Sequence, residues 1–186
     1  MRVGVLASGS GTILRALVER DLPIVVAVFD RPCGAIDVAA AHGVATEVVE
    51  RTDFSPQFDR EAYTHEVIDA LRRHDIDLVA IAGFGTILSK PFVDEYGGRA
   101  VNTHPALLPA FKGWHAVRDA LEFGVKVSGC TVHLVAEDVD SGPILAQAAV
   151  PVLDDDTEAT LHERIKEVER QLYPDVLEKL IKDRQS

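Results

Sequence analysis

Apolar and polar residues alternate between two patterns along the first half of the chain. Short apolar runs of strand length are separated by stretches in which apolar residues recur at helical spacing. The expected strands are 3–7, 24–29, 45–49, 78–82 and 99–103, and the expected helices are 12–20, 34–42 and 59–74. This rhythm predicts an α/β fold with a mostly parallel sheet that is flanked by helices.

The second half changes pattern. Two apolar stretches at 126–135 and 144–152 flank an Asp-Ser-Gly turn at 140–142, which predicts an antiparallel strand pair and therefore a mixed sheet. A long helical pattern follows Asp156 and Thr157, which stand in capping positions, and Pro174 marks a point where this closing helix could bend. No linker or repeat interrupts the chain, so one domain is expected over residues 1–186.

Composition narrows the function classes. The 186 residues are 47% hydrophobic and 26% charged, which is typical of a globular domain. A net charge of −11 disfavours nucleic-acid binding, because that affinity comes mainly from lysine and arginine. No apolar run approaches the roughly 20 residues of a membrane span, and no secretion signal is visible, so a cytoplasmic protein is expected. Cys33 and Cys130 match no redox or zinc spacing and are interpreted as reduced core thiols.

A glycine loop follows the first expected strand. The run Ser8-Gly9-Ser10-Gly11-Thr12 leads directly into a helix. Glycine lets the backbone approach an anion, and free N–H groups at a helix start attract negative charge, so the loop predicts a phosphate cradle. A tight strand-to-helix turn would need the same glycines for its geometry alone. Leu14 replaces the third glycine of a dinucleotide fingerprint, yet Asp30 follows at a suitable distance, so a nicotinamide cofactor stays open.

Asn102 and His104 stand two positions apart at the end of the strand expected at 99–103. Alternate strand residues share a face, so both side chains are expected to point into one site. An imidazole can donate a proton and a carboxamide donates hydrogen bonds without titrating, a combination that suits an oxygen gaining negative charge. Local hydrogen bonding at a strand end would explain the pair without catalysis.

Asp140 opens the turn between the two later strands. A carboxylate there could orient His104 and collect a proton from an attacking amine. Aspartate before Ser-Gly-Pro is also a common turn former. Taken together, Asn102, His104 and Asp140 predict a catalytic centre.

Three segments resemble the folate-dependent formyltransferases. They are Asn-Thr-His-Pro-Ala-Leu-Leu-Pro at 102–109, Gly-Cys-Thr-Val-His at 129–133 and Asp-Ser-Gly-Pro-Ile at 140–144. The likeness covers nearly the whole chain. It implies a single-domain Rossmann-like formyltransferase fold with a long C-terminal helix, in which 1–100 is the phosphate-binding half and 101–186 the catalytic and folate-binding half.

The resemblance also implies a reaction. The formyl group of 10-formyltetrahydrofolate, a co-substrate, would pass directly to the amine of 5'-phosphoribosylglycinamide in purine biosynthesis. Asn102 and His104 would stabilise the oxyanion of the tetrahedral intermediate, and Asp140 would hold the imidazole and assist proton transfer. Both substrates are small molecules, and a monomer or a homodimer is expected.

The family's binding residues carry over by position. The acceptor's phosphate and ribose are expected at Gly11, Thr12, Ile13, Lys166 and Glu169. The folate is expected at Ile87, Leu88, Val135 and Asp140. This chain departs from the family pattern in three places: Gly85-Thr86 replaces a frequent Met-Arg, Ser10 and Ile13 replace frequent asparagines, and Lys112 replaces a frequent proline.

Other functions would fit parts of the sequence. A formyltetrahydrofolate deformylase would use the same centre to pass the formyl group to water, but its relatives usually carry an extra N-terminal domain, whereas this chain starts at its first core strand. Formyltransferases for amino sugars or aminoacyl-tRNA normally add a C-terminal domain. A noncatalytic nucleotide-binding module would leave Asn102, His104 and Asp140 without a shared task.

A metal centre is a further alternative. The sequence lacks the short ligand spacings of common zinc sites, and the transfer that the resemblance implies needs no Lewis acid, so no metal is expected. His115 and His133 are expected to line or support the cleft.

Overall fold

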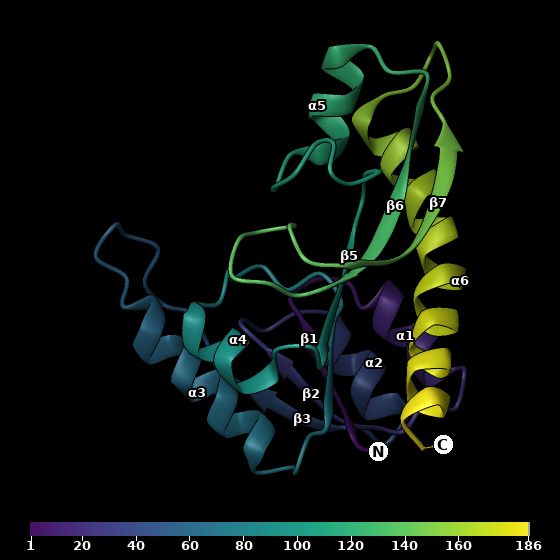
Figure 1. Cartoon of the computed structure of the whole chain (residues 1–186). Helices are drawn as coiled ribbons and strands as arrows, with labels where there is room; N and C mark the ends of the chain where they lie inside the picture. The colour runs from purple at the N-terminus through teal and green to yellow at the C-terminus, as the bar shows by residue number, and fades with distance from the viewer. Residues whose placement is uncertain (186) are drawn as a thin grey trace. The chain divides into compact units, whose positions relative to one another are not determined.

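The structure, a computed structural model, describes residues 1–185 and divides into two compact units, Met1–Val101 and Asn102–Ser186. The elements of the first unit are β1 (Val3–Ala7), α1 (Thr12–Val18), β2 (Ile24–Phe29), α2 (Ala35–Ala41), β3 (Ala45–Val48), α3 (Arg60–Arg72), β4 (Leu78–Ile81) and α4 (Lys90–Tyr96). The unit boundary falls inside β5 (Ala100–His104), and α5 (Ala116–Phe123), β6 (Val127–Leu134), β7 (Ile144–Pro151) and α6 (Glu158–Gln185) follow (Figure 1).

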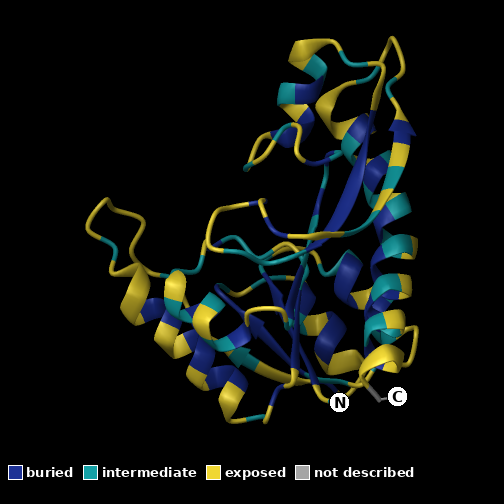
Figure 2. Ribbon diagram, viewed as in Figure 1, coloured by how far each residue is buried: buried dark blue, intermediate teal, exposed yellow. Residues whose placement is uncertain are grey.

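The strands of the first unit are parallel. β1 pairs with β2 on one side and with β4 on the other, and β2 pairs with β3. All five residues of β1 are buried, as its near-continuous apolar sequence requires of a central parallel strand (Figure 2). The chain first builds outward to β3 and then returns to β4, so the strand order reverses beside the carboxyl end of β1. Ligands bind at such a switch point in open α/β sheets, and the loop after β1 lies there.

The second unit is built around an antiparallel strand pair. β6 pairs with β7, and the register shifts between Val132 and His133, which is a β-bulge or an equivalent irregularity. The apolar face of α6 packs on this pair through Leu161 and Ile165, which are fully buried against Cys130 and Val150. Thr157 caps α6 by accepting a hydrogen bond from the Thr160 N–H at 3.2 Å.

These observations confirm the predicted fold class. The seven strands form one sheet in the order β3-β2-β1-β4-β5-β6-β7, and the β6–β7 pair makes it mixed. The closing helix runs from Glu158 to Gln185 and continues through Pro174 (Figure 1). Of the two thiols, Cys130 is buried as expected, whereas Cys33 is only half-buried, so its assignment to the core was wrong.

Candidate active site

His104 lies at the end of β5, where the strand gives way to the loop before α5. Its side chain is almost completely buried. Nε2 lies 2.8 Å from the carbonyl oxygen of Phe111, and Nδ1 lies 3.3 Å from Oδ2 of Asp140. Both ring nitrogens therefore face oxygen atoms, and only the doubly protonated ring can donate to both at once.

Asp140 lies at the centre of a cluster that also contains His104 and His133. It adopts a left-handed backbone conformation (φ 51°) in the turn before β7, and its carboxylate is buried. Oδ2 accepts a hydrogen bond from the backbone N–H of Gly113 at 2.9 Å, while Oδ1 lies 3.5 Å from Nε2 of His133. Burial raises the pKa of this carboxyl, but the hydrogen bonds from His133 and Gly113 and the charges of the two imidazoles outweigh it, so the pKa of Asp140 is lowered.

His133 is the second imidazole of the cluster, and it stands at the register shift of β6. Bulges re-aim side chains and recur next to active sites. Nδ1 faces the carbonyl oxygen of Leu134 at 2.9 Å, and Nε2 lies 3.3 Å from Nδ2 of Asn102. Nε2 accepts from this amide in the tautomer protonated at Nδ1 alone, and it donates to Asp140 only when it is itself protonated. The sequence predicted only a supporting place for His133; its position in the segment Gly-Cys-Thr-Val-His at 129–133 was the available signal.

Asn102 therefore joins the cluster through His133. The predicted trio of Asn102, His104 and Asp140 is brought into one connected group, and the fourth member, His133, closes the link between the amide and the carboxylate. His115, expected to line or support the cleft, is exposed at the start of α5. A buried carboxylate between two imidazoles and a carboxamide can orient hydrogen-bond donors and move a proton.

Glu169 is a second buried carboxylate in this unit. It projects from α6, is 5% exposed, and accepts a hydrogen bond from Oγ1 of Thr103 at 2.8 Å. Burial raises the pKa of Glu169, and the Thr103 hydrogen bond and the charges of Lys166 and Arg170 only partly oppose this. Lys166 is half-buried on the same helix. Lys166 and Glu169, two of the five residues predicted for acceptor binding, are thus electrostatic neighbours.

The glycine loop of the first unit contains one glycine that the fold requires. Gly11 has φ 80°, and a Cβ there would lie 2.7 Å from Cα of Ala35 in α2. Gly9 differs, because a Cβ at that position would meet no atom within 4 Å. Thr12 is half-buried and Ile13 is buried.

Residues predicted to contact the folate occur in both units. In the first unit Ile87 is 51% exposed and Leu88 is half-buried. In the second unit Val135 is half-buried, five positions before Asp140. An exposed large apolar side chain such as Ile87 is available for a ligand.

Known proteins share this sequence along most of its length. A family model described as formyl transferase matches residues 1–177.

The chain belongs to the formyl transferase family. It is 51% identical over 176 residues to phosphoribosylglycinamide formyltransferase of Mycobacterium tuberculosis, which covers 92% of this chain and 80% of that protein. The enzyme of that name from Bacillus subtilis is 36% identical, covering 97% and 94%. The crystal structure of phosphoribosylglycinamide formyltransferase from Anaplasma phagocytophilum superimposes with a TM-score of 0.89 at 38% identity, covering 98% of this chain and 88% of that one.

These relatives confirm the family predicted from the sequence. They favour a formyl transferase over both a deformylase and a noncatalytic nucleotide-binding module, because all three carry the transferase name and match along nearly the full chain. Among residues 1–185 no helix is both long enough and apolar enough to cross a membrane.

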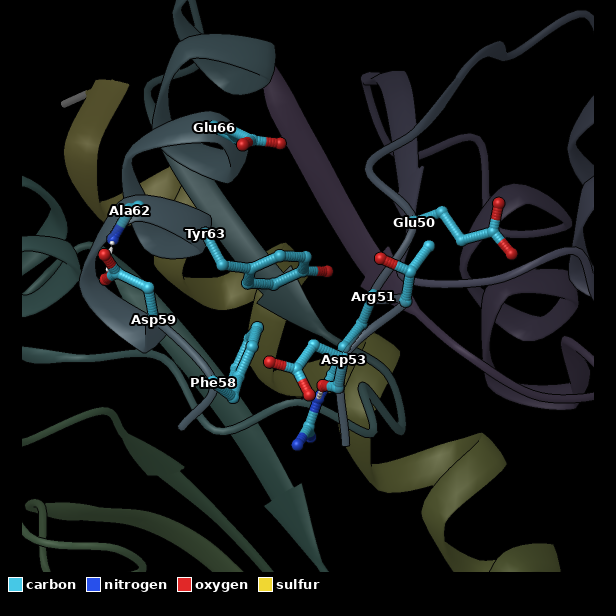
Figure 3. Close-up of a pocket in the computed structure, with 9 residues that line it drawn as sticks. Glu50, Arg51, Asp53, Phe58, Asp59, Ala62, Tyr63 and Glu66 are labelled. Atoms are coloured by element: carbon cyan, nitrogen blue, oxygen red, sulfur yellow. Dashed lines mark hydrogen bonds between the residues drawn. The ribbon is translucent and has the colours of Figure 1, made fainter. Parts of the chain in front are cut away.

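One surface pocket of the formyl transferase fold holds none of the predicted site residues. It has a volume of about 270 Å³ and lies in the first unit between the loop after β3 and the start of α3 (Figure 3). Its lining residues are Glu50, Arg51, Thr52, Asp53, Phe58, Asp59, Ala62, Tyr63 and Glu66. The Arg51 guanidinium stacks on Phe58, and Tyr63 donates to the Val49 carbonyl, so internal contacts explain both side chains.

Proposed function

We propose that this formyl transferase transfers the formyl group of 10-formyltetrahydrofolate to the amine of 5'-phosphoribosylglycinamide. The observation that carries the proposal is the connected group of buried His104, Asp140 and His133 with half-buried Asn102. The names of its relatives support the same reaction. As a step of purine synthesis, the reaction is expected in the cytoplasm.

The chemistry is a direct transfer. The acceptor nitrogen forms a bond to the formyl carbon, the bond between that carbon and N10 of the folate breaks, and the proton lost by the amine ends on N10. The formyl oxygen carries negative charge in the tetrahedral intermediate, and donors placed beforehand stabilise it. Holding both substrates together supplies a further part of the rate, so a covalent enzyme intermediate is not needed.

His104 and Asn102 are proposed as the oxyanion donors. Nε2 of His104 points at the Phe111 carbonyl, which accepts the hydrogen bond that a substrate oxygen would take over. Asp140 stabilises the charged imidazole from the opposite nitrogen and, through the loop N–H of Gly113, fixes the segment that carries Phe111. His133 is a positioning residue, because it contacts both the Asn102 amide and the Asp140 carboxylate.

The acceptor is proposed to bind at two places. The backbone N–H groups of Gly11, Thr12 and Ile13 would hold its phosphate, with the charge of Lys166 contributing. Glu169 would accept hydrogen bonds from ribose hydroxyls. Such contacts suit an acidic protein, because they depend on local donors and not on net charge.

The folate is proposed to contact Ile87, Leu88, Val135 and Asp140. Apolar side chains suit the faces of a pterin ring, and polar groups beside them suit its ring nitrogens.

An assay with both substrates tests the function. The purified protein is expected to formylate phosphoribosylglycinamide, and His104→Ala is expected to lower kcat at least about 100-fold while far-UV circular dichroism stays unchanged. If formate is released as fast without the acceptor as with it, the protein is a hydrolase and the proposed transferase function is wrong. A His162→Ala variant, altered on α6 away from the cluster, serves as the control.

A further inference from the structure

Polar side chains from three neighbouring parallel strands meet at one place in the first unit. Ser8 follows β1, Asp30 and Arg31 follow β2, and Gly85 with Thr86 follows β4. These are the carboxyl ends of the strands on both sides of the switch point, where open α/β sheets bind ligands. Arg31 has no part in the mechanism above.

Asp30 anchors this group. Its side chain is completely buried, and its carboxylate accepts hydrogen bonds from Nε and Nη2 of Arg31, at 2.9 and 3.2 Å, and from Oγ1 of Thr86 at 2.9 Å. Burial raises the pKa of this carboxyl, but the hydrogen bonds from Arg31, Ser8 and Thr86 lower it below its usual range. The Arg31 guanidinium is thus held from one edge by a fixed negative charge.

The Arg31 side chain is 43% exposed, so part of it remains open to solvent. An ion pair with a buried partner adds little net stability, because desolvation offsets the attraction. What the pair does provide is orientation: two parallel hydrogen bonds fix the plane of the guanidinium. An arginine fixed in this way presents its remaining N–H groups without further loss of side-chain entropy.

Gly85 leaves the space that the guanidinium occupies. A Cβ at this position would lie 2.7 Å from Nη2 of Arg31 and 3.1 Å from Oδ2 of Asp30. The same glycine donates its N–H to Oγ of Ser8 at 2.6 Å, which ties this loop to the glycine loop after β1. Any side chain at position 85 would displace Arg31 from its hydrogen bonds.

We propose that Arg31, oriented by Asp30 and admitted by Gly85, is a substrate-binding residue that pairs with an anionic oxygen of one of the two substrates. The inference rests on the proposed function and names a further contact for it. Two sources share this chemistry: the phosphate of the acceptor and the glutamate carboxylates of the folate. In a chain of net charge −11, a fixed cation at the switch point attracts either anion locally, whereas the rest of the protein repels it.

Two single variants and their combination test the inference. Arg31→Gln removes the charge, and Gly85→Ala keeps the charge but displaces the guanidinium. Each is expected to raise the Kd of the same substrate, measured by titration calorimetry, by about 10-fold or more for Arg31→Gln and less for Gly85→Ala. The double variant Arg31→Gln/Gly85→Ala is expected to have the same Kd as Arg31→Gln alone, because the two changes remove the same single interaction.

The substrate affected identifies the anion. A rise confined to phosphoribosylglycinamide, with weaker competition by inorganic phosphate, assigns Arg31 to the phosphate. A rise confined to the folate, larger for a triglutamate than for a monoglutamate, assigns it to the tail.

Arg72→Gln is the matched control, because Arg72 pairs with Glu95 at 2.5 Å on the surface of the same unit. It is expected to leave both Kd values unchanged. If Arg31→Gln lowers the melting temperature but changes neither Kd, the ion pair is only structural and the inference is wrong. If Arg31→Gln does not fold, Gly85→Ala and the neutral pair Asp30→Asn/Arg31→Gln give the same readout. A wild-type protein that binds both substrates but transfers no formyl group would contradict the proposed function alone.

Discussion

Asp140 is the residue on which the candidate active site depends. Its carboxylate lies between two imidazoles, and the loop N–H of Gly113 donates to it. These contacts lower the pKa of Asp140 and keep its carboxylate ionised. A group that holds both the ring and the loop beside it affects catalysis through orientation as well as charge.

Asp140→Asn is expected to lower kcat at least about 100-fold, because the amide keeps the size but loses the charge that stabilises the imidazole. The KM values are expected to change much less. Steady-state kinetics over pH 5–9 measure this, with Asp138→Asn, an exposed residue of the same loop, as control. A kcat near that of the wild type would remove Asp140 from the mechanism.

Glu169, a proposed acceptor-binding residue, lowers the stability of the fold at neutral pH. Its pKa is raised by burial, so the folded state holds the proton more tightly than the unfolded chain does. Its contribution to stability is therefore greatest below 4.5, the ordinary pKa of a glutamate side chain, and is lost as pH rises through the raised folded value. At neutral pH the burial of this carboxyl is therefore a net penalty.

Glu169→Gln is expected to raise the melting temperature at pH 7.5, because the amide carries no charge to desolvate and can still accept from Thr103. The gain is expected to shrink towards pH 4.5. The same change is expected to raise the acceptor KM about 10-fold through the loss of charge-assisted hydrogen bonds. Glu167→Gln, at an exposed position of α6, provides the comparison. A lower melting temperature at pH 7.5 would contradict the electrostatic account.

At the scale of elements, two glycines of the loop after β1 have different roles. Gly11 packs against Ala35 with a left-handed backbone, so it joins α1 to α2 and its replacement tests the fold. Gly9 is open, and no positive φ constrains it. Only Gly9 therefore tests ligand binding cleanly.

Gly9→Leu is expected to raise the acceptor KM at least about 10-fold, because the new side chain would occupy the open face of the loop where a phosphate would lie. The folate KM and the melting temperature are expected to stay near those of the wild type. Gly11→Ala, in contrast, is expected to destabilise the fold by about 1 kcal/mol or more. An unchanged acceptor KM in Gly9→Leu would place the phosphate elsewhere.

The sequence predicted helices and strands better than it predicted contacts between side chains. The strands at 3–7 and 24–29 match β1 and β2 because apolar runs of strand length depend on local pattern alone. Helices α4 (Lys90–Tyr96) and α5 (Ala116–Phe123) were not predicted, although they are no shorter than α1 and α2, which were. The register shift at His133 and the packing of Arg31 against Gly85 depend on which strands become neighbours, and no local pattern carries that information.

At the scale of the whole molecule, the net charge of the protein opposes the approach of the proposed anionic substrates. A chain of −11 repels an anionic acceptor over the Debye length, which falls from about 30 Å at 10 mM salt to about 8 Å at 150 mM. Local donors act at contact distance, where salt screens them less. Association and final binding are therefore expected to respond differently to salt.

Raising the salt from about 10 to about 150 mM is expected to increase kcat/KM for the acceptor about twofold, because screening weakens the long-range repulsion before it weakens the contacts. An acceptor analogue without the phosphate is expected to show no increase. Stopped-flow association rates of both compounds measure the difference. A fall in kcat/KM would mean that local cations such as Arg31 and Lys166 dominate the field that an approaching anion meets. The acidic remainder of the surface would then have no influence on its capture.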